Sequence, residues 1–150
     1  MNKAIASIFG IGFIKGGGTV AAVVTCAALY LLWMQPWFNN PLYLLVLTIL
    51  VTVLGIYVGD KVEPYWGKDS YRVVIDEVSG MMVTMLFIPH NLYFLLAGLV
   101  LFRFFDIVKP LYIRRMEAFP GGVGVMMDDV LAGVYANIVL QAIVFAYSYF

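Results

Sequence analysis

Apolar runs, separated by short polar connections, fill most of this chain and leave few folds open to it. Hydrophobic residues make up 63% of its 150 residues and charged ones 12%, whereas a soluble domain carries about 25% charged residues. This imbalance predicts a membrane protein, and the length suits one domain over residues 1–150. The expected fold class is all-α, a polytopic bundle of about five transmembrane helices plus a short interfacial helix. The expected spans are 19–33, 42–59, 72–88, 92–108 and 125–150.

The third span is the shortest apolar run, and it has acids at its start. Residues 78–88 supply only about half of the roughly 20 apolar residues that a membrane helix needs. Extending the helix back to residue 72 gives it the length of the fourth span, but places Asp76 and Glu77 inside it. An ionisable side chain at that depth is costly and by default marks a functional site.

Three segments on the charged side lie outside the expected helices, one before the first helix and two between helices. Residues 1–18 form a glycine-broken segment, for which a flexible lead-in is the simpler interpretation and an anion-binding helix start is the alternative. In the connection 60–72, Pro64 and Gly67 should keep the second helix from continuing. Residues 110–119 alternate bulky and charged side chains, as a short helix lying in the membrane interface does.

Charge is confined to one side of the expected bundle. The turns 35–41 and 89–91 would face one side and contain no Lys or Arg, so all nine basic residues fall on the other side. All nine acidic residues fall there too. Because basic residues favour the cytoplasmic side of a membrane, we expect any chemistry to be cytoplasmic. The balanced net charge gives no indication of a nucleic-acid partner.

Carboxylates converge on that face, and their grouping indicates a metal site. A cation relieves the repulsion between them, and oxygen ligands favour Mg²⁺, which also binds substrate phosphate. The acids are Asp76, Glu77, Asp106, Asp128 and Asp129. Arg72, Arg103 and Lys109 accompany them and would face phosphate oxygens. Arg103, Asp106 and Lys109 are three residues apart and therefore share one side of a helix.

Other interpretations of these charges remain open. Interfacial charges can cap helix ends, which is how we interpret Lys61, Lys68 and Asp69. An ion-coupled carrier also uses intramembrane acids, but it would distribute them through the depth of the bilayer. His90 falls in the opposite turn and Cys26 in an apolar run, so neither offers a phosphate-transferring nucleophile. The remaining chemistry is metal-dependent attack on a phosphate at the membrane surface. The attacking group would be water or, less favoured, a carboxylate.

Three blocks in the second half of the chain resemble the phosphatidylglycerophosphatase A family. They read Asp-Glu-Val-Ser-Gly at 76–80, Phe-Arg-Phe-Phe-Asp-Ile-Val-Lys-Pro at 102–110, and Gly-Gly-Val-Gly-Val-Met-Met-Asp-Asp-Val-Leu-Ala-Gly at 121–133. All three occur in the family's order and with similar spacing. The N-terminal block departs from the family loop, read roughly as Pro-Gly-Thr-x-Gly-Ser. Residues 17–22 read Gly-Gly-Thr-Val-Ala-Ala, so only Gly18 and Thr19 match.

The resemblance implies a bacterial inner-membrane, Mg²⁺-dependent lipid phosphatase that removes the phosphate monoester of phosphatidylglycerol phosphate at the cytoplasmic face. It implies that the catalytic and metal-binding residues are the five acids Asp76, Glu77, Asp106, Asp128 and Asp129. It also implies that four residues contact the substrate phosphate: Arg103, Lys109, Gly18 and Thr19. The altered loop, with Lys15 before it, keeps phosphatidylinositol phosphate open as an alternative substrate. An ion-coupled carrier is the more distant alternative.

Overall fold

The computed structural model describes residues 1–68 and 70–149, which form helices and no strand. The four long helices are α2 (Gly17–Trp33), α3 (Pro41–Trp66), α5 (Leu92–Val108) and α7 (Gly121–Tyr147). The shorter ones are α1 (Asn2–Ala6), α4 (Ile75–Thr84) and α6 (Ile113–Met116), with single 3-10 turns η1 (Ile11–Phe13) and η2 (Pro36–Phe38). The all-α prediction is therefore confirmed for the described residues.

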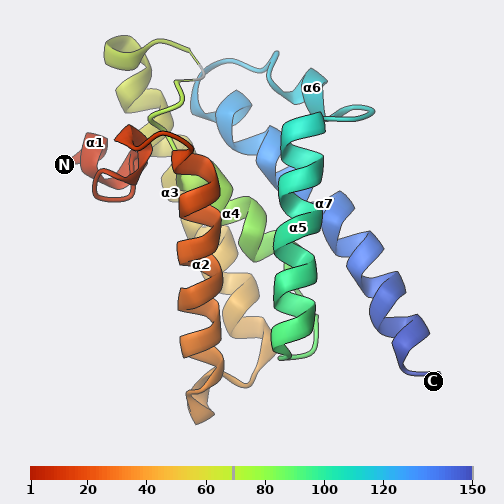
Figure 1. The fold of residues 1–150 in the computed structure, drawn as a ribbon. Coiled ribbons are helices and arrows are strands. Elements are labelled where there is room, and N and C mark those ends of the chain that lie inside the picture. Colours follow the sequence, from red (N-terminus) through yellow and green to blue (C-terminus); the bar gives the residue numbers. More distant parts are fainter. Residues whose placement is uncertain (69, 150) are drawn as a thin grey trace.

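The short helix α4 lies at the centre of the bundle and packs against all four long helices (Figure 1). Eight of its ten residues are buried. Its methionines join the main apolar core together with side chains of the surrounding helices, among them Leu29, Leu95, Phe102 and Leu140. A helix enclosed on all sides holds the residues of its own first turn inside the bundle, and in α4 that turn carries Asp76 and Glu77.

Where helix α4 ends inside the bundle, a side chain of α7 binds its last carbonyl and one in the turn that follows. The amide nitrogen of Asn137 donates hydrogen bonds to the carbonyl oxygens of Thr84 and Leu86, at 2.9 Å each. The final carbonyls of a helix have no partner within the helix, and such groups are costly to bury unpaired. Asn137 therefore allows a ten-residue helix where the sequence predicted one over 72–88.

The predicted boundaries hold most closely for α2 and α5. Helix α5 covers Leu92–Val108 as expected, and it begins where Asn91 Oδ1 accepts a hydrogen bond from Tyr93 N at 2.8 Å. It ends at Lys109, whose backbone is left-handed with φ 46°. A residue in this conformation turns the chain away from the helix axis. The backbone of Lys109 is thereby held in one position, from which its side chain reaches back toward the bundle.

Helix α3 extends well beyond residue 59, so the prediction that Pro64 would stop it is wrong, whereas the prediction that Gly67 would stop it is confirmed. The helix runs through Pro64 to Trp66 and ends at Gly67, which has φ 85°. Proline removes only one backbone donor, and here it does so in the last turn. Val62 lies in the extension and is buried beside Val58 in a second apolar cluster, which stabilises the extension.

Helix α7 also starts earlier than expected, at Gly121 instead of residue 125. Asp60, from the extended part of α3, accepts a hydrogen bond from Gly122 N at 2.6 Å and so satisfies a donor in the first turn of α7. The expected interfacial helix over 110–119 shrinks to the single turn of α6. Within it Ile113 is fully buried in the core, so this turn is anchored in the bundle.

The glycine-broken N-terminal segment is docked onto the bundle and is not a loose lead-in. Ala6 is fully buried, and its carbonyl accepts a hydrogen bond from Val74 N at 2.9 Å. The ring of Phe13 meets Trp66 edge-on with centroids 5.8 Å apart, and the Arg72 guanidinium lies over the same Phe13 ring. These contacts join residues 1–18 to the connection before α4.

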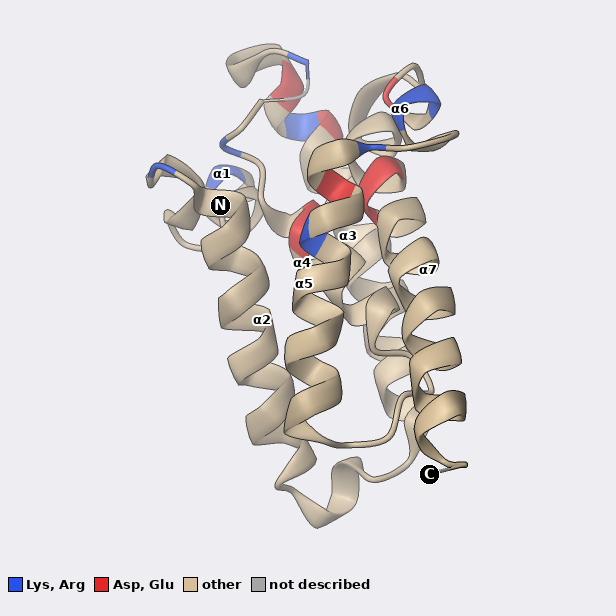
Figure 2. Cartoon of the chain, turned by 45° about the vertical axis from the view of Figure 1, so that its right-hand side comes forward, with Lys and Arg blue, Asp and Glu red and all other residues tan. Residues whose placement is uncertain are grey.

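Charged residues gather at one end of the molecule (Figure 2). At the other end the ring of His90 stacks on Trp33 with centroids 4.7 Å apart, so residues 75–90 cross the bundle from the charged end to the opposite one. Lys61 and Lys68 are exposed, as interfacial charges would be. Asp69, interpreted in the same way, lies outside the described residues.

Helix length supports fewer membrane spans than the sequence predicted. Within the described residues, α3 and α7 are long and apolar enough to cross a membrane. Helices α2 and α5 have 17 residues each and α4 has 10, less than the roughly 20 that a perpendicular span needs. Two helices therefore qualify as candidate spans by length and composition alone, and the number of spans stays a prediction.

Candidate active site

Helices α4 and α7 bring the acidic residues together because their backbones approach closely. A side chain at Gly80 would collide with the Phe102 ring and the Asp129 carbonyl oxygen, and one at Gly133 would collide with the Gly80 carbonyl oxygen. Only glycine permits this contact. It places the first turn of α4, with Asp76, beside the third turn of α7, which contains Asp129.

All of the acids predicted for the site lie at the charged end of the bundle, and most are buried. Relative exposure is 9% for Asp76 and Asp106 and 3% for Asp128 and Asp129, while the Glu77 side chain is 15% exposed. Burying an ionised carboxylate is costly unless it is paired or binds a cation. The partners of each acid therefore indicate what it does.

Asp76, Glu77 and Asp129 form an acidic trio in which one oxygen from each side chain lies within 4.8 Å of the others. Two buried oxygens of the trio, Glu77 Oε2 and Asp129 Oδ2, have no hydrogen-bond partner within the described residues. Three carboxylates this close repel one another when ionised. An oxygen-rich group with unused buried oxygens fits a hard divalent cation such as Mg²⁺.

Arg103 lies between the acidic trio and Asp106. Its Nη1 donates a hydrogen bond to Asp106 Oδ2, three residues along α5, and lies 4.0 Å from Glu77 Oε1. Arg103 Nε is buried and has no hydrogen-bond partner among the described residues. The guanidinium has more donors than these two carboxylates use, so it is able to bind another anion beside the trio.

Lys109 is committed to two carboxylates. Its Nζ lies 2.6 Å from Asp128 Oδ2 and 2.7 Å from Glu117 Oε1. Burial disfavours the ammonium charge, but hydrogen bonds to Asp128 and Glu117 outweigh this effect and raise the pKa of Lys109 above its ordinary value. The geometry thus pairs Lys109 with Asp128, where the sequence predicted a contact of the substrate phosphate. Glu117 was not singled out from the sequence, because its nearness to Lys109 depends on the turn that ends α5.

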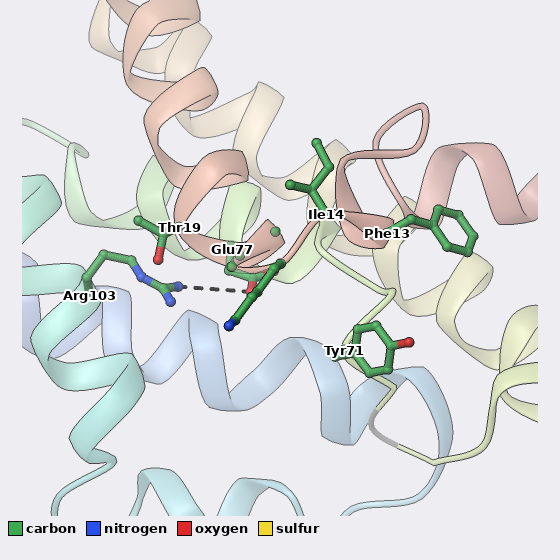
Figure 3. Close-up of a pocket in the computed structure, with 10 residues that line it drawn as sticks. Phe13, Ile14, Thr19, Tyr71, Glu77 and Arg103 are labelled. Atoms are coloured by element: carbon green, nitrogen blue, oxygen red, sulfur yellow. Dashed lines mark ion pairs between the residues drawn. The ribbon is translucent and has the colours of Figure 1, made fainter.

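A cavity of about 540 Å³ opens beside the trio (Figure 3). Its lining residues are Phe13, Ile14, Lys15, Gly16, Gly17, Gly18, Thr19, Tyr71, Glu77 and Arg103. Gly18 begins the close contact of α2 with α4, since a side chain there would collide with the Glu77 carboxylate. The Thr19 hydroxyl points toward Arg103 in Figure 3. The first turn of α2 therefore faces the site, and helix N-termini favour anions.

The structure brings together most of the residues that the sequence predicted, and divides them by partner. Gly18, Thr19, Glu77 and Arg103 line one cavity, and Asp76 and Asp129 complete the trio with Glu77. Asp106 pairs with Arg103, and Asp128 pairs with Lys109. The sequence reasoning missed the aromatic wall of Phe13 and Tyr71. No motif marks these residues, because they reach the cavity only through the docking of the N-terminal segment.

Comparisons with known proteins identify the relatives of this chain. Residues 4–144 match the family model described as Phosphatidylglycerophosphatase A. A Bacteroides thetaiotaomicron protein provisionally named phosphatidylinositol-3-phosphatase is 43% identical over 141 residues, 88% of this chain and 86% of the relative. Two proteins named phosphatidylglycerophosphatase A follow. That of Haemophilus influenzae is 42% identical over 102 residues (66% of this chain, 63% of the relative), and that of Escherichia coli 33% over 129 residues (84% and 73%). No solved structure matches.

The ion pair between Lys109 and Asp128 yields a prediction about stability. Lys109→Met should lower the free energy of unfolding by about 3 kcal/mol, because it leaves the nearly buried Asp128 carboxylate without its cation. The double variant Lys109→Met/Asp128→Asn should recover much of this loss. Thermal unfolding in detergent measures both, with the exposed Arg114→Met as the matched control. An equal loss in the single and double variants would contradict the pairing.

Proposed function

Because the chain belongs to the phosphatidylglycerophosphatase A family and is thus a phosphoric monoester hydrolase, we propose that it hydrolyses the phosphate monoester of phosphatidylglycerol phosphate. The products are phosphatidylglycerol and phosphate. The observation that carries the proposal is the acidic trio of Asp76, Glu77 and Asp129 with Arg103 beside it. Glu77 and Arg103 line a cavity large enough for a head group.

We propose that the reaction depends on Mg²⁺ held by the trio. Support comes from the unused buried oxygens of Glu77 and Asp129 and from the all-oxygen donor set. When bound, Mg²⁺ would offset the charge of the acids and polarise the phosphoryl oxygens. Asp106 and Asp128 are each already paired with a cation, so they are weaker candidates for Mg²⁺ ligands than the trio.

The cations and donors around the trio would orient the substrate. Arg103 would bind phosphate oxygens with the donors that Asp106 and Glu77 leave free, and would stabilise the charge that develops on them. Gly18 and Thr19, in the first turn of α2, present backbone N–H groups at the same wall of the cavity. Lys109 would act from a distance by holding Asp128 in place.

The chemical step in this proposal is attack of water on phosphorus. The water oxygen forms the new P–O bond while its proton passes to a carboxylate of the acidic group, and the bond from phosphorus to the head-group oxygen breaks. The departing oxygen takes up the proton that the carboxylate received, through solvent, so that one water is consumed overall and the carboxylate is regenerated. General-base assistance of this kind contributes about 10²–10⁴-fold, so one carboxylate oxygen must remain available to the water.

Phosphatidylinositol phosphate is the second candidate substrate, with the same chemistry. It is favoured by the 43% identity to the relative named for a phosphatidylinositol phosphatase and by the departure of residues 17–22 from the family loop. An ion-coupled carrier is disfavoured because the acids lie together at the charged end of the described residues (Figure 2).

We propose that the protein lies in the bacterial cytoplasmic membrane with about five crossings and the site on the cytoplasmic side. The long apolar helices α3 and α7 support this, as do the exposed apolar side chains on the outer faces of the helices, for example Leu31, Leu50, Val53, Val100 and Ile138. Helices shorter than the hydrocarbon core are accommodated by local thinning of the bilayer.

Phosphate release from the purified protein tests the proposed function. Phosphatidylglycerol phosphate should be hydrolysed faster than phosphatidylinositol 3-phosphate and phosphatidic acid in the same detergent. Activity should be lost in EDTA and return with excess Mg²⁺, because the trio needs a cation to bind phosphate. Preference for the inositol lipid would overturn the first choice of substrate. Activity unchanged by EDTA would overturn the metal site.

Substitution of the trio tests its role. Asp129→Asn is nearly isosteric and removes one charged ligand, so turnover should fall by about 10²-fold or more while the folded state remains. Glu63→Gln removes an acid from the same end of the molecule outside the trio, and should leave turnover within a factor of about two. Near-normal turnover of Asp129→Asn would remove Asp129 from the site.

Topology tests the membrane arrangement. The N-terminus lies at the charged end and the end of α7 at the opposite one (Figure 1). An odd number of crossings therefore requires the C-terminus to face away from the cytoplasm. A C-terminal fusion should be active with a periplasm-dependent reporter such as alkaline phosphatase and silent with a fluorescent protein that matures only in the cytoplasm. The reverse result would contradict the arrangement.

A further inference from the structure

The cavity beside the acidic trio is larger than one phosphate group requires. Its volume of about 540 Å³ lies within the range of roughly 300–1,000 Å³ that is typical of small-molecule sites. In Figure 3 Glu77, Arg103 and Thr19 lie toward one side, while Phe13 and Tyr71 lie toward the other. A phosphate held at Arg103 thus leaves the part of the cavity near Phe13 and Tyr71 for the remainder of a head group.

Lys15 lines this cavity and has an unused charge. It is exposed, and it makes no hydrogen bond, ion pair or cation–π contact with the residues that the structure describes. The other cations near the cavity already have partners, and the donors that Arg103 keeps free are assigned to the monoester phosphate. Arg103 pairs with Asp106 and Glu77, and Arg72 lies over the rings of Phe13 and Tyr71. Lys15 is therefore the lining cation that is available to a second anion.

The backbone on both sides of Lys15 is fixed by the fold. Ile14 N donates a hydrogen bond to the Ile11 carbonyl at 3.0 Å, and Gly17 N donates one to the Ile14 carbonyl at 2.9 Å. Gly16 has φ 77° and directs the chain into α2. Lys15 is thus held at the cavity wall by its neighbours while its long side chain remains free to move, as suits a point-charge contact to phosphate.

Both candidate substrates carry a second anion of the same kind. In phosphatidylglycerol phosphate and in phosphatidylinositol 3-phosphate, a phosphodiester joins the head group to diacylglycerol, and it remains on the lipid after the monoester is cleaved. We propose that Lys15 binds this phosphodiester while Arg103 and the acidic trio act on the monoester. This inference rests on the proposed function, and it assigns the selectivity for lipids with two phosphates to a residue outside the acidic cluster.

The proposal makes a lipid with a single phosphate a poor substrate. In phosphatidic acid the monoester is attached directly to diacylglycerol, so no phosphodiester reaches Lys15 when the monoester lies at Arg103. A charge-assisted contact formed equally in the ground state and the transition state lowers KM and leaves kcat unchanged. Loss of Lys15 should therefore appear in KM.

The test compares Lys15→Gln with Lys15→Arg and Lys68→Gln, in neutral detergent micelles at constant lipid surface concentration. Lys68 is an exposed lysine outside the cavity lining, so Lys68→Gln removes the same charge elsewhere. With whichever two-phosphate lipid the wild type hydrolyses faster, Lys15→Gln should raise KM by about tenfold at unchanged kcat. Lys15→Arg and Lys68→Gln should stay within about twofold of wild type.

Two product inhibitors separate the contacts. The dephosphorylated lipid retains only the phosphodiester, and its inhibition constant should rise about tenfold in Lys15→Gln. Inorganic phosphate probes the monoester position, and its inhibition constant should not change. The assignment would be overturned if the dephosphorylated lipid had the same inhibition constant in Lys15→Gln and wild type. It would also be overturned if inorganic phosphate inhibited Lys15→Gln more weakly than wild type. If the wild type hydrolyses no lipid monoester, the proposed function fails. In that case, direct binding of phosphatidylglycerol to wild type and to Lys15→Gln tests by itself whether Lys15 binds the phosphodiester.

Discussion

Burial of carboxylates among α4, α5 and α7 is the constraint on which the rest of the structure depends. An ionised carboxylate inside a protein is stable only with a cation or donors close by. Asp106 has Arg103, and Asp128 has Lys109. The trio around Asp129 lacks an equivalent cation of its own within the described residues, apart from the longer contact of Arg103 to Glu77. The fold thus gathers negative charge at a position where a metal ion can balance it and bind a phosphate.

The central position of α4 makes this arrangement possible. A helix of ten residues is too short to cross the bundle alone, and where it ends inside, Asn137 binds its last carbonyl and one in the turn that follows. Its first turn then lies near the charged end, where α7 can reach it through the contact of Gly80 with Gly133. The docked N-terminal segment closes the remaining side and supplies Lys15 and Phe13, while the connection before α4 supplies Tyr71, the other ring of the aromatic wall.

Much of this could be predicted from the sequence because it depends on composition and helical period. The apolar runs predicted all of the long helices, and 92–108 matches α5 at both ends. Pro64 misled the prediction of α3, because a local helix-breaking tendency was weighed without the burial of Val58 and Val62. Lys109 was expected to face phosphate, because helix phase gives a direction but does not say which acid from another helix will lie there.

The sequence by itself determined that the chain is helical and apolar, that its charges lie toward one end, and which acids belong to one group. These features follow from residue types and their spacing along single helices. Only the tertiary structure decided how the acids divide between a trio and two ion pairs, and that residues 13–19 and Tyr71 form one cavity with Arg103. The reason is that distances between residues far apart in the chain depend on how closely helices pack, and here glycines at the α4–α7 contact set that closeness.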